Sequence, residues 1–378
     1  MKIELIDSLS AISAAEWNAV AGIDHPFTRH EFLDALERSG SADAESGWQP
    51  LHVLVRRGRE LIAVMPLYLK YHSYGEYVFD WSWADAYQRH GRRYYPKLLG
   101  AIPFTPATGP RLCVAPGEDS APIAAAIIAE LRRQIARADI SSLHVLFPDG
   151  NFGAELAAAG LSERSGVQYH WSNAGFASFD DFLATFSSRK RKNLRKERER
   201  IGEQDLVLRV LEGAEIGAAE WQLFHHFYQL TYAKRSGHGG YLNEQFFQLL
   251  GAQLQPHTVM TLAEWRGETV AGALYFRDST ALYGRYWGSA REFDCLHFEA
   301  CYYQGIEYCI RNGLQRFDPG AQGEHKIQRG FAPVRTHSYH WIEDRDFRAA
   351  IDHFLERERL GIDAHIVEAR ELLPFRCG

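Results

Sequence analysis

An internal repeat constrains the fold of this chain more than any other feature of its sequence. The string Ile-Ser-Ala-Ala-Glu-Trp, which ends at Trp17, recurs as Ile-Gly-Ala-Ala-Glu-Trp, which ends at Trp221. Gly58 and Gly267 each follow an arginine and separate two apolar runs, a pattern that predicts strand, turn and strand in both halves. We therefore expect two copies of one unit, each with an amphipathic helix, several alternating strands, a helix and a further strand. That order predicts an α/β (α+β) fold in which helices flank a mixed sheet in each copy.

A further pair of matching strings keeps the same order along the chain. Tyr94-Tyr95 opens a stretch of the first half, and Tyr302-Tyr303 opens the corresponding stretch of the second half. The length of 378 residues suits two domains of roughly 100–200 residues each. We place the first domain at residues 1–165 and the second at residues 166–378.

The composition excludes several classes of protein. With 46% hydrophobic and 24% charged residues, the chain is expected to be folded and soluble, and its net charge of −6 is not that of a dedicated nucleic-acid binder. The five cysteines form no Cys-x-x-Cys pair, so neither a complete disulfide framework nor a zinc ribbon fits. The start of the chain is acidic where a leader would be apolar, and no stretch approaches the ~18 apolar residues of a spanning helix. We expect a cytoplasmic protein without a transmembrane segment.

A strongly basic segment, residues 187–202, opens the second copy. It holds eight Lys or Arg and two Glu, a local charge of +6 within a chain whose total is −6. Ser187 or Ser188 is suited to an N-cap and Gly202 to a C-cap, so we expect a basic helix. Such a helix is either a solvated face or a contact for phosphates. In the second case the residues expected to contact RNA are Arg189, Lys190, Arg191, Lys192 and Lys196.

These features together resemble a known family. The doubled unit, the basic helix and the segment Gly313–Pro333 resemble the Fem-like branch of the GNAT acyltransferases, a bacterial family described as predicted N-acyltransferases or peptidoglycan biosynthesis proteins. Tyr286–Ser289, Leu296–Gly305 and Asp80–Tyr87 carry the same resemblance. It implies two tandem GNAT-like domains and the transfer of an acyl or aminoacyl group to an amine.

The resemblance also implies a role for one lysine. Fem enzymes take the aminoacyl group from aminoacyl-tRNA and bind a nucleotide-linked cell-wall precursor through a Phe-Lys-x-x-Phe-Gly segment. The comparable place here begins His325-Lys326 and has a different spacing, so Lys326 carries over while His325 departs from the pattern.

The segment from Asp318 to Arg329 is the main candidate site of the second copy. Direct transfer needs an unprotonated amine, a stabilised carbonyl oxygen and a proton for the leaving group. Asp318 and Glu324 are the candidate catalytic acids, and the glycines of the segment allow close approach of a ligand. A polar surface turn with an internal ion pair is the alternative, and in either case we expect Lys326 outside the core. The candidate substrate-binding residues here are Gln322, His325, Lys326 and Arg329.

The first copy contains a second candidate site around Asp80–Tyr87. Trp81, Trp83 and Asp85 would share one face of a strand, and an unpaired carboxylate is costly to bury, so Asp85 is the candidate acid of this half. Aromatic rings beside arginines suit a pocket for the acceptor. Its candidate residues are Trp83, Tyr87, Arg92 and Tyr95.

The donor is left open between two classes. Arg285-Tyr-Trp-Gly288-Ser-Ala290 keeps the spacing of a GNAT pyrophosphate loop, which is compatible with acyl-CoA, whereas the basic helix favours aminoacyl-tRNA. His297 with Cys301, and His337 with His340, lack the further ligands of a zinc site, so no metal is expected. We expect no permanently bound cofactor, a donor that acts as co-substrate, and a small-molecule or peptide amine as acceptor. A non-catalytic protein that binds RNA or another anion is the remaining alternative.

Overall fold

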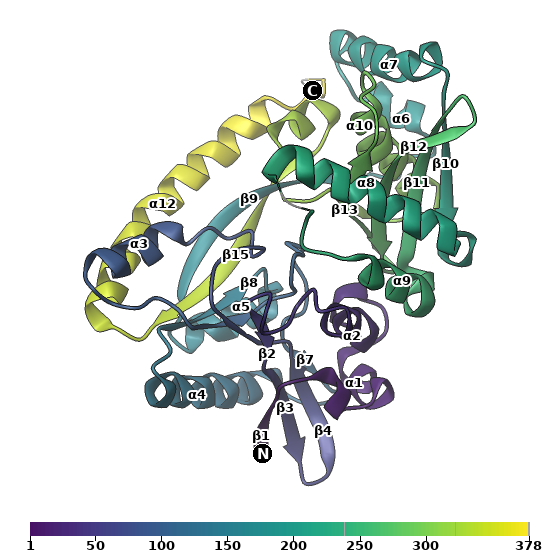
Figure 1. The fold of residues 1–378 in the computed structure, drawn as a ribbon. Coiled ribbons are helices and arrows are strands. Elements are labelled where there is room, and N and C mark those ends of the chain that lie inside the picture. Colours follow the sequence, from purple (N-terminus) through teal and green to yellow (C-terminus); the bar gives the residue numbers. More distant parts are fainter. Residues whose placement is uncertain (238, 322, 377–378) are drawn as a thin grey trace. The chain divides into compact units, whose positions relative to one another are not determined.

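The computed structural model describes residues 1–237, 239–321 and 323–376 and contains two compact units (Figure 1). Unit 1 is Met1–Gly166 with Arg335–Ala364, and unit 2 is Val167–Val334 with His365–Gly378. The expected boundary after residue 165 lies beside the observed one. The second domain is not continuous as expected, however, because residues 335–364 belong to unit 1.

Unit 1 contains two groups of paired strands and five α-helices. It also contains the first part of a sixth helix, α12, up to Ala364. One sheet has the strand order β1-β3-β4-β7, and the other strands follow the order β15-β8-β6-β5-β2, in which only β6 and β8 are parallel. The strands are β1 (Lys2–Ile6), β2 (Trp48–Pro50), β3 (His52–Arg57), β4 (Glu60–Met65), β5 (Tyr68–Lys70), β6 (Lys97–Gly100), β7 (Cys113–Val114), β8 (Ser142–Leu146) and β15 (Ala332–Ile342). The helices are α1 (Ala14–Ala21), α2 (His30–Arg38), α3 (Trp81–Arg89), α4 (Ser120–Ala138), α5 (Gly150–Ala158) and α12 (Arg345–Glu371).

Unit 2 is built on one sheet with the strand order β10-β11-β12-β13-β14-β9, in which only β13 and β14 are parallel. Its strands are β9 (Ser162–Ser172), β10 (Leu206–Glu212), β11 (Thr258–Trp265), β12 (Glu268–Arg277), β13 (Ala281–Ser289) and β14 (Arg316–Asp318). Its helices are α6 (Phe179–Ala184), α7 (Ser188–Glu203), α8 (Ala218–Ser236), α9 (Glu244–Gln253), α10 (Leu296–Phe298) and α11 (Gln304–Arg311), with the π-helical turn Glu299–Tyr303 between the last two.

The predicted repeat is confirmed at two of its three matches. Trp17 lies in α1 and Trp221 in α8, and both side chains are buried. The two glycine turns join β3 to β4 and β11 to β12. The third match is wrong as a structural equivalence: Tyr94 precedes strand β6, whereas Tyr302 lies in the π-helical turn, because identical dipeptides do not fix the surrounding backbone.

Helix α8 lies close against the sheet of unit 2. Figure 1 shows this helix running across the strands. Its buried side chains Trp221, Phe224 and Phe227 recur at helical spacing. Phe224 lies beside Gly272 of β12. Gly288 on β13 makes the approach possible, because a Cβ atom there would lie 2.2 Å from the backbone carbonyl carbon of Phe227. This glycine therefore sets the distance between α8 and β13.

Among the described residues, no helix is both long enough and apolar enough to cross a membrane. The four described cysteines, Cys113, Cys295, Cys301 and Cys309, are free thiols.

We predict that Gly288→Ala destabilises the protein by about 1–3 kcal/mol, since the added methyl group must displace backbone rather than a flexible side chain. Gly202→Ala is the matched control: Gly202 lies within α7 and a Cβ atom there meets nothing within 4 Å. The control should stabilise by up to about 0.5–1 kcal/mol, because alanine favours helix over glycine. Urea unfolding of both variants checks this, and equal unfolding midpoints would contradict the close approach of α8.

Candidate functional site

A cavity lies in unit 2 where β13 and β14 separate. The two strands pair in parallel only as far as Tyr283 and Asp318, whereas β13 continues to Ser289. A cavity of about 270 Å³ lies beside this continuation, with its walls formed by α8, β12, β13, the 296–302 helical segment and Pro319. The polar and aromatic residues of its walls include Thr231, Tyr232, Arg235, Arg285, Tyr286, Trp287, His297, Cys301 and Tyr302.

Tyr302 and His325 form a hydrogen-bonded pair at this cavity. The hydroxyl oxygen of Tyr302 lies 2.9 Å from Nε2 of His325. Burial raises the pKa of Tyr302 above its usual value, whereas burial and the nearby cations of Arg329 and Lys326 lower the pKa of His325. At neutral pH the pair is a protonated phenol beside a neutral imidazole, an arrangement that can pass a proton to a substrate and recover it.

Arg285 and Asp318 form a buried ion pair beside the cavity. Nη2 of Arg285 lies 2.7 Å from Oδ2 of Asp318, and the other carboxylate oxygen accepts a hydrogen bond from the N–H of Gly320 at 2.9 Å. Burial alone would raise the pKa of Asp318, but Arg285 and the nearby His170 hold it well below its usual range. Asp318, a predicted catalytic acid, is therefore ionised and bound by donors, and it is not among the described residues of the cavity wall.

The segment that follows is partly buried, although the sequence predicted Lys326 outside the core. Glu324–Arg329 forms a short 3-10 helix, and Lys326 is only 1% exposed. Its ammonium donates a hydrogen bond to the carbonyl oxygen of Gly320 at 2.6 Å, and burial lowers its pKa to about 8. The expectation for Lys326 was wrong because the backbone of Gly320 and Gly323, both at positive φ, folds the segment inward.

The other predicted residues of this segment have different environments. Glu324 is exposed, and Gln322 lies outside the described residues. Arg329 is buried, donates to both carboxylate oxygens of Glu197 at 2.9 Å and lies over the ring of Phe298. Among the described residues of this segment, His325 contacts the cavity wall through Tyr302 and through the ring of His297.

The basic helix is confirmed as α7, with Ser187 as its N-cap. The expected C-cap is wrong: Gly202 lies inside the helix and Gln204 caps it. The inner face is anchored, because Leu194 is buried and Arg198 donates to Glu299 at 2.8 Å and to Glu307 at 2.6 Å. Lys190 donates to Gln328 and Arg191 is half-buried, so both belong to this anchored side.

The outer face of α7 carries Arg189, Lys192 and Lys196 at i, i+3 and i+7, which places them on one stripe. All three side chains are exposed, and none forms an ion pair with the residues of the described ranges. This stripe, rather than all five predicted residues, is the surface that α7 offers to an anion.

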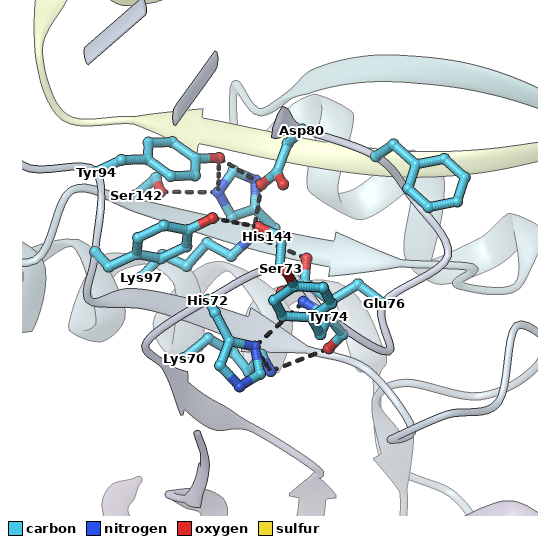
Figure 2. Close-up of polar contacts among 12 residues, drawn as sticks. Lys70, His72, Ser73, Tyr74, Glu76, Asp80, Tyr94, Lys97, Ser142 and His144 are labelled. Carbon is cyan, nitrogen blue, oxygen red and sulfur yellow. Dashed lines mark hydrogen bonds and ion pairs between the residues drawn. The ribbon is translucent and has the colours of Figure 1, made fainter. Parts of the chain in front are cut away.

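Unit 1 contains a buried ionic network around Lys97 (Figure 2). The Lys97 ammonium donates to Glu76 at 2.8 Å, to Asp80 at 2.5 Å and to Ser73 at 2.9 Å. Burial alone would lower the pKa of Lys97, but Glu76 and Asp80 raise it. Burial raises the pKa of Glu76 to about 7. Tyr94 donates to Asp80 at 2.6 Å, which connects the network to β8 through His144.

The predicted site of the first copy is only partly assembled. Residues 81–89 form a helix rather than a strand, so Trp83 is 4% exposed while Asp85 points to solvent. Asp80 is the buried acid of this region. Tyr87 stacks on Phe347 in the core.

The remaining two acceptor candidates are Tyr95 and Arg92, and the guanidinium of Arg92 lies over the ring of Phe347, 5.8 Å from its centroid. Tyr95 is bonded to Ser73 at 2.8 Å. Arg92, paired with Asp344, lines a groove of about 530 Å³ that Trp83 and Phe347 also line.

Two features of the unit 2 cavity differ from the sequence analysis. Arg285–Ser289 is part of strand β13 and not a loop, because Tyr286–Ser289 pair with β12 and Arg285 lies at the bulge that precedes them. The sequence analysis did not name Arg235 or Tyr302 as a site residue, although Tyr302 lies in the Leu296–Gly305 segment that carries the family resemblance. His297 and Cys301 had been noticed only as partners at i and i+4 on a helix, which is the signal that could have placed them on one wall of a pocket.

The comparisons with known proteins agree with this architecture. A family model, FemAB_like, described as peptidoglycan biosynthesis/recognition, matches residues 8–377. No curated protein matches the sequence. The solved structure of FemX is 13% identical, with 93% of this chain and 100% of that chain covered, at a TM-score of 0.53.

Two further structures are similar over most of the chain. L-PGS from Bacillus licheniformis is 12% identical, with 94% and 99% coverage and a TM-score of 0.51. A tandem GNAT protein from the clavulanic acid biosynthesis pathway is 11% identical, with 91% and 98% coverage and a TM-score of 0.47. Each of the two units places helices against strands of a mixed sheet, as the repeat predicted. Because the family model spans nearly the whole sequence, the chain belongs to the FemAB-like family.

Proposed function

We propose that this protein is an N-acyltransferase that moves an acyl or aminoacyl group to an amine at the cavity beside β13. The observation that carries the proposal is the early end of the ladder between β13 and β14, next to a cavity with aromatic walls and the Tyr302–His325 pair. A backbone edge of this kind offers N–H groups to the carbonyl oxygen of an acyl donor. Membership of the FemAB-like family supports the same class of reaction.

The proposed reaction needs no covalent intermediate. A neutral amine attacks the donor carbonyl carbon, a C–N bond forms, and the C–O bond of an ester or the C–S bond of a thioester breaks. Tyr302 gives its proton to the leaving oxygen or sulfur, and the amine releases one proton, which His325 can return to Tyr302. Arg235, Lys326 and Arg329 all act to lower the pKa of His297 in the wall, and the same positive surroundings would favour the unprotonated form of an entering amine.

Tyr302→Phe tests the proton donor. We expect kcat to fall by roughly 10²–10⁴-fold with little change in KM, because only the transition state needs the proton. Tyr303→Phe is the matched control: this neighbouring tyrosine is bonded to Glu197 and is not among the described cavity residues. Steady-state kinetics with acyl-CoA and aminoacyl-tRNA donors, in the presence of amine and peptide acceptors, measures both variants. Equal rates for the two would remove Tyr302 from the chemistry.

The two candidate donor classes predict different roles for the outer stripe of α7, which is Arg189, Lys192 and Lys196. If an aminoacyl-tRNA is the donor, Arg189, Lys192 and Lys196 are the cations that meet its phosphates, because the other basic residues of the inner face are engaged. If acyl-CoA is the donor, the stripe stays solvated.

We predict that replacing Arg189, Lys192 and Lys196 together by Gln reduces the slope of log affinity for tRNA against log salt by about two, at roughly 0.7 per phosphate contact. Arg59, Arg133 and Arg137, exposed in unit 1, give a control triple with the same change in net charge. Titration of labelled tRNA at three salt concentrations measures the slopes. Equal slopes for both triples, or no binding by the wild type, would leave acyl-CoA as the donor.

Lys326→Met tests whether the buried ammonium of Lys326 stabilises the fold. We expect that it does not. Its folded-state pKa of about 8 lies below the unfolded value of ~10.4, so between these two pH values the unfolded state binds more protons and the unfolding free energy rises with pH. Below pH 8 the charged form destabilises the fold by about 3 kcal/mol. We expect the variant to be no less stable at pH 7 and to lose this rise, as measured by urea unfolding at pH 7 and pH 9.5. A variant that is much less stable at pH 7 would show that Lys326 stabilises the fold.

A further inference from the structure

We propose that Arg235 binds a carboxylate group of a substrate in the cavity beside β13 and thereby determines which substrates the protein accepts. This inference rests on the proposed function, because it deepens the description of the same site. The ligand is a small organic acid, and its carboxylate belongs either to the acyl group or to the acceptor amine.

The position of Arg235 gives it access to a ligand. It lies in the last turn of α8 and lines both the cavity of about 270 Å³ and an adjoining one of about 430 Å³. The two cavities share Thr231, Trp287 and His297 as well as Arg235, so they form one continuous site. Arg235 is exposed and makes no ion pair or hydrogen bond with any residue that the structure describes.

The charges around the site leave Arg235 without a counter-ion. No described residue of the first cavity is an acid, and the second cation there, Arg285, is paired with Asp318. In the adjoining cavity, Glu292 pairs with Lys234 at 3.7 Å and Asp294 pairs with Arg200 at 3.5 Å.

The pKa of His297 in the cavity wall agrees with an excess of positive charge around the site. The pKa of His297 is lowered to about 3, most strongly by burial and in addition by every charged or titratable neighbour that contributes, including Arg235.

The shape of the site favours a carboxylate over other charged groups. A guanidinium group presents a planar fork of donors that matches the two oxygens of a carboxylate. The walls beyond Arg235 carry the rings of Tyr286, Trp287 and Tyr302, which suit the apolar body of a small molecule. Arg285, the other cation of that wall, is already held in an ion pair, so the one unpaired guanidinium suits a single carboxylate rather than a chain of phosphates. A substrate ammonium group would meet the positive surroundings unpaired, and it would be disfavoured.

The test uses two probes of equal size that differ in charge, glutarate and its diamide, with the full-length protein. We expect glutarate to bind, as measured by titration calorimetry, and the diamide not to bind. Arg235→Gln should weaken glutarate binding by about ten- to a hundredfold, the range for a lost hydrogen bond to a charged group. The control Arg59→Gln, at an exposed residue that lines neither cavity, should leave the affinity within about twofold of the wild type.

Three outcomes would overturn the proposal: no binding of glutarate, equal binding of the diamide, or equal losses in the two variants. Inorganic pyrophosphate is the competing probe, and if it binds more tightly than glutarate with the same dependence on Arg235, the residue serves a phosphate. Binding is measured without turnover, so a protein that binds glutarate through Arg235 but transfers no acyl group would contradict the proposed function alone. A protein that transfers acyl groups with unchanged kinetics in Arg235→Gln would contradict this inference alone.

If transfer activity is found, paired substrates identify the source of the acid. A succinyl donor compared with a butyryl donor tests the acyl group, and an amino acid compared with its amide tests the acceptor. The substrate whose advantage disappears in Arg235→Gln carries the recognised carboxylate, and an advantage that disappears in neither pair would overturn the proposal.

Discussion

The ion pair between Arg285 and Asp318 fixes the point at which the sheet of unit 2 opens, and the candidate site depends on that opening. Asp318 is the last residue of β14, and its carboxylate holds both Arg285 of β13 and the backbone N–H of Gly320. Pro319 between them has no N–H to donate to a ladder. The chain therefore leaves β13 at this place, and the rest of β13 lines a cavity.

Further ion pairs hold the elements around the cavity. Some cations there, such as Arg198 and Arg285, are in ion pairs with acids, whereas Arg235 is in none with the described residues. Arg198 joins α7 to Glu299 in the π-helical turn, and that turn also carries Tyr302 at the cavity wall. Insertions of this type in helices are common at functional sites. The inner face of α7 therefore holds the π-helical turn in place, and its outer face is exposed to solvent. Arg235 lines the cavity from α8.

The two copies have used their buried charges differently. In unit 1 the parallel strands are β6 and β8, and Lys97 at the start of β6 is fully buried between Glu76 and Asp80. In unit 2 the parallel pair is β13 and β14, and the charges at its end border a cavity. Removing one member of the Lys97 network would leave an uncompensated buried charge, which is strongly destabilising. We therefore assign the network a structural role, and the proposed site of transfer is the cavity of unit 2.

The sequence by itself determined the features that depend on neighbouring residues: the duplication, the helices that carry Trp17 and Trp221, the glycine turns between strands, and the basic helix with its Ser187 cap. Only the tertiary structure decided which of the candidate side chains meet. Asp85 became exposed and Asp80 buried because residues 81–89 form a helix, and Lys326 turned inward on glycine backbone. Arg235 and Tyr302 reach one cavity because α8 and the π-helical turn, which are distant in sequence, form walls of the same cavity. Caps and turns are local chemistry, whereas burial and convergence follow from strand pairing and helix packing across the whole unit.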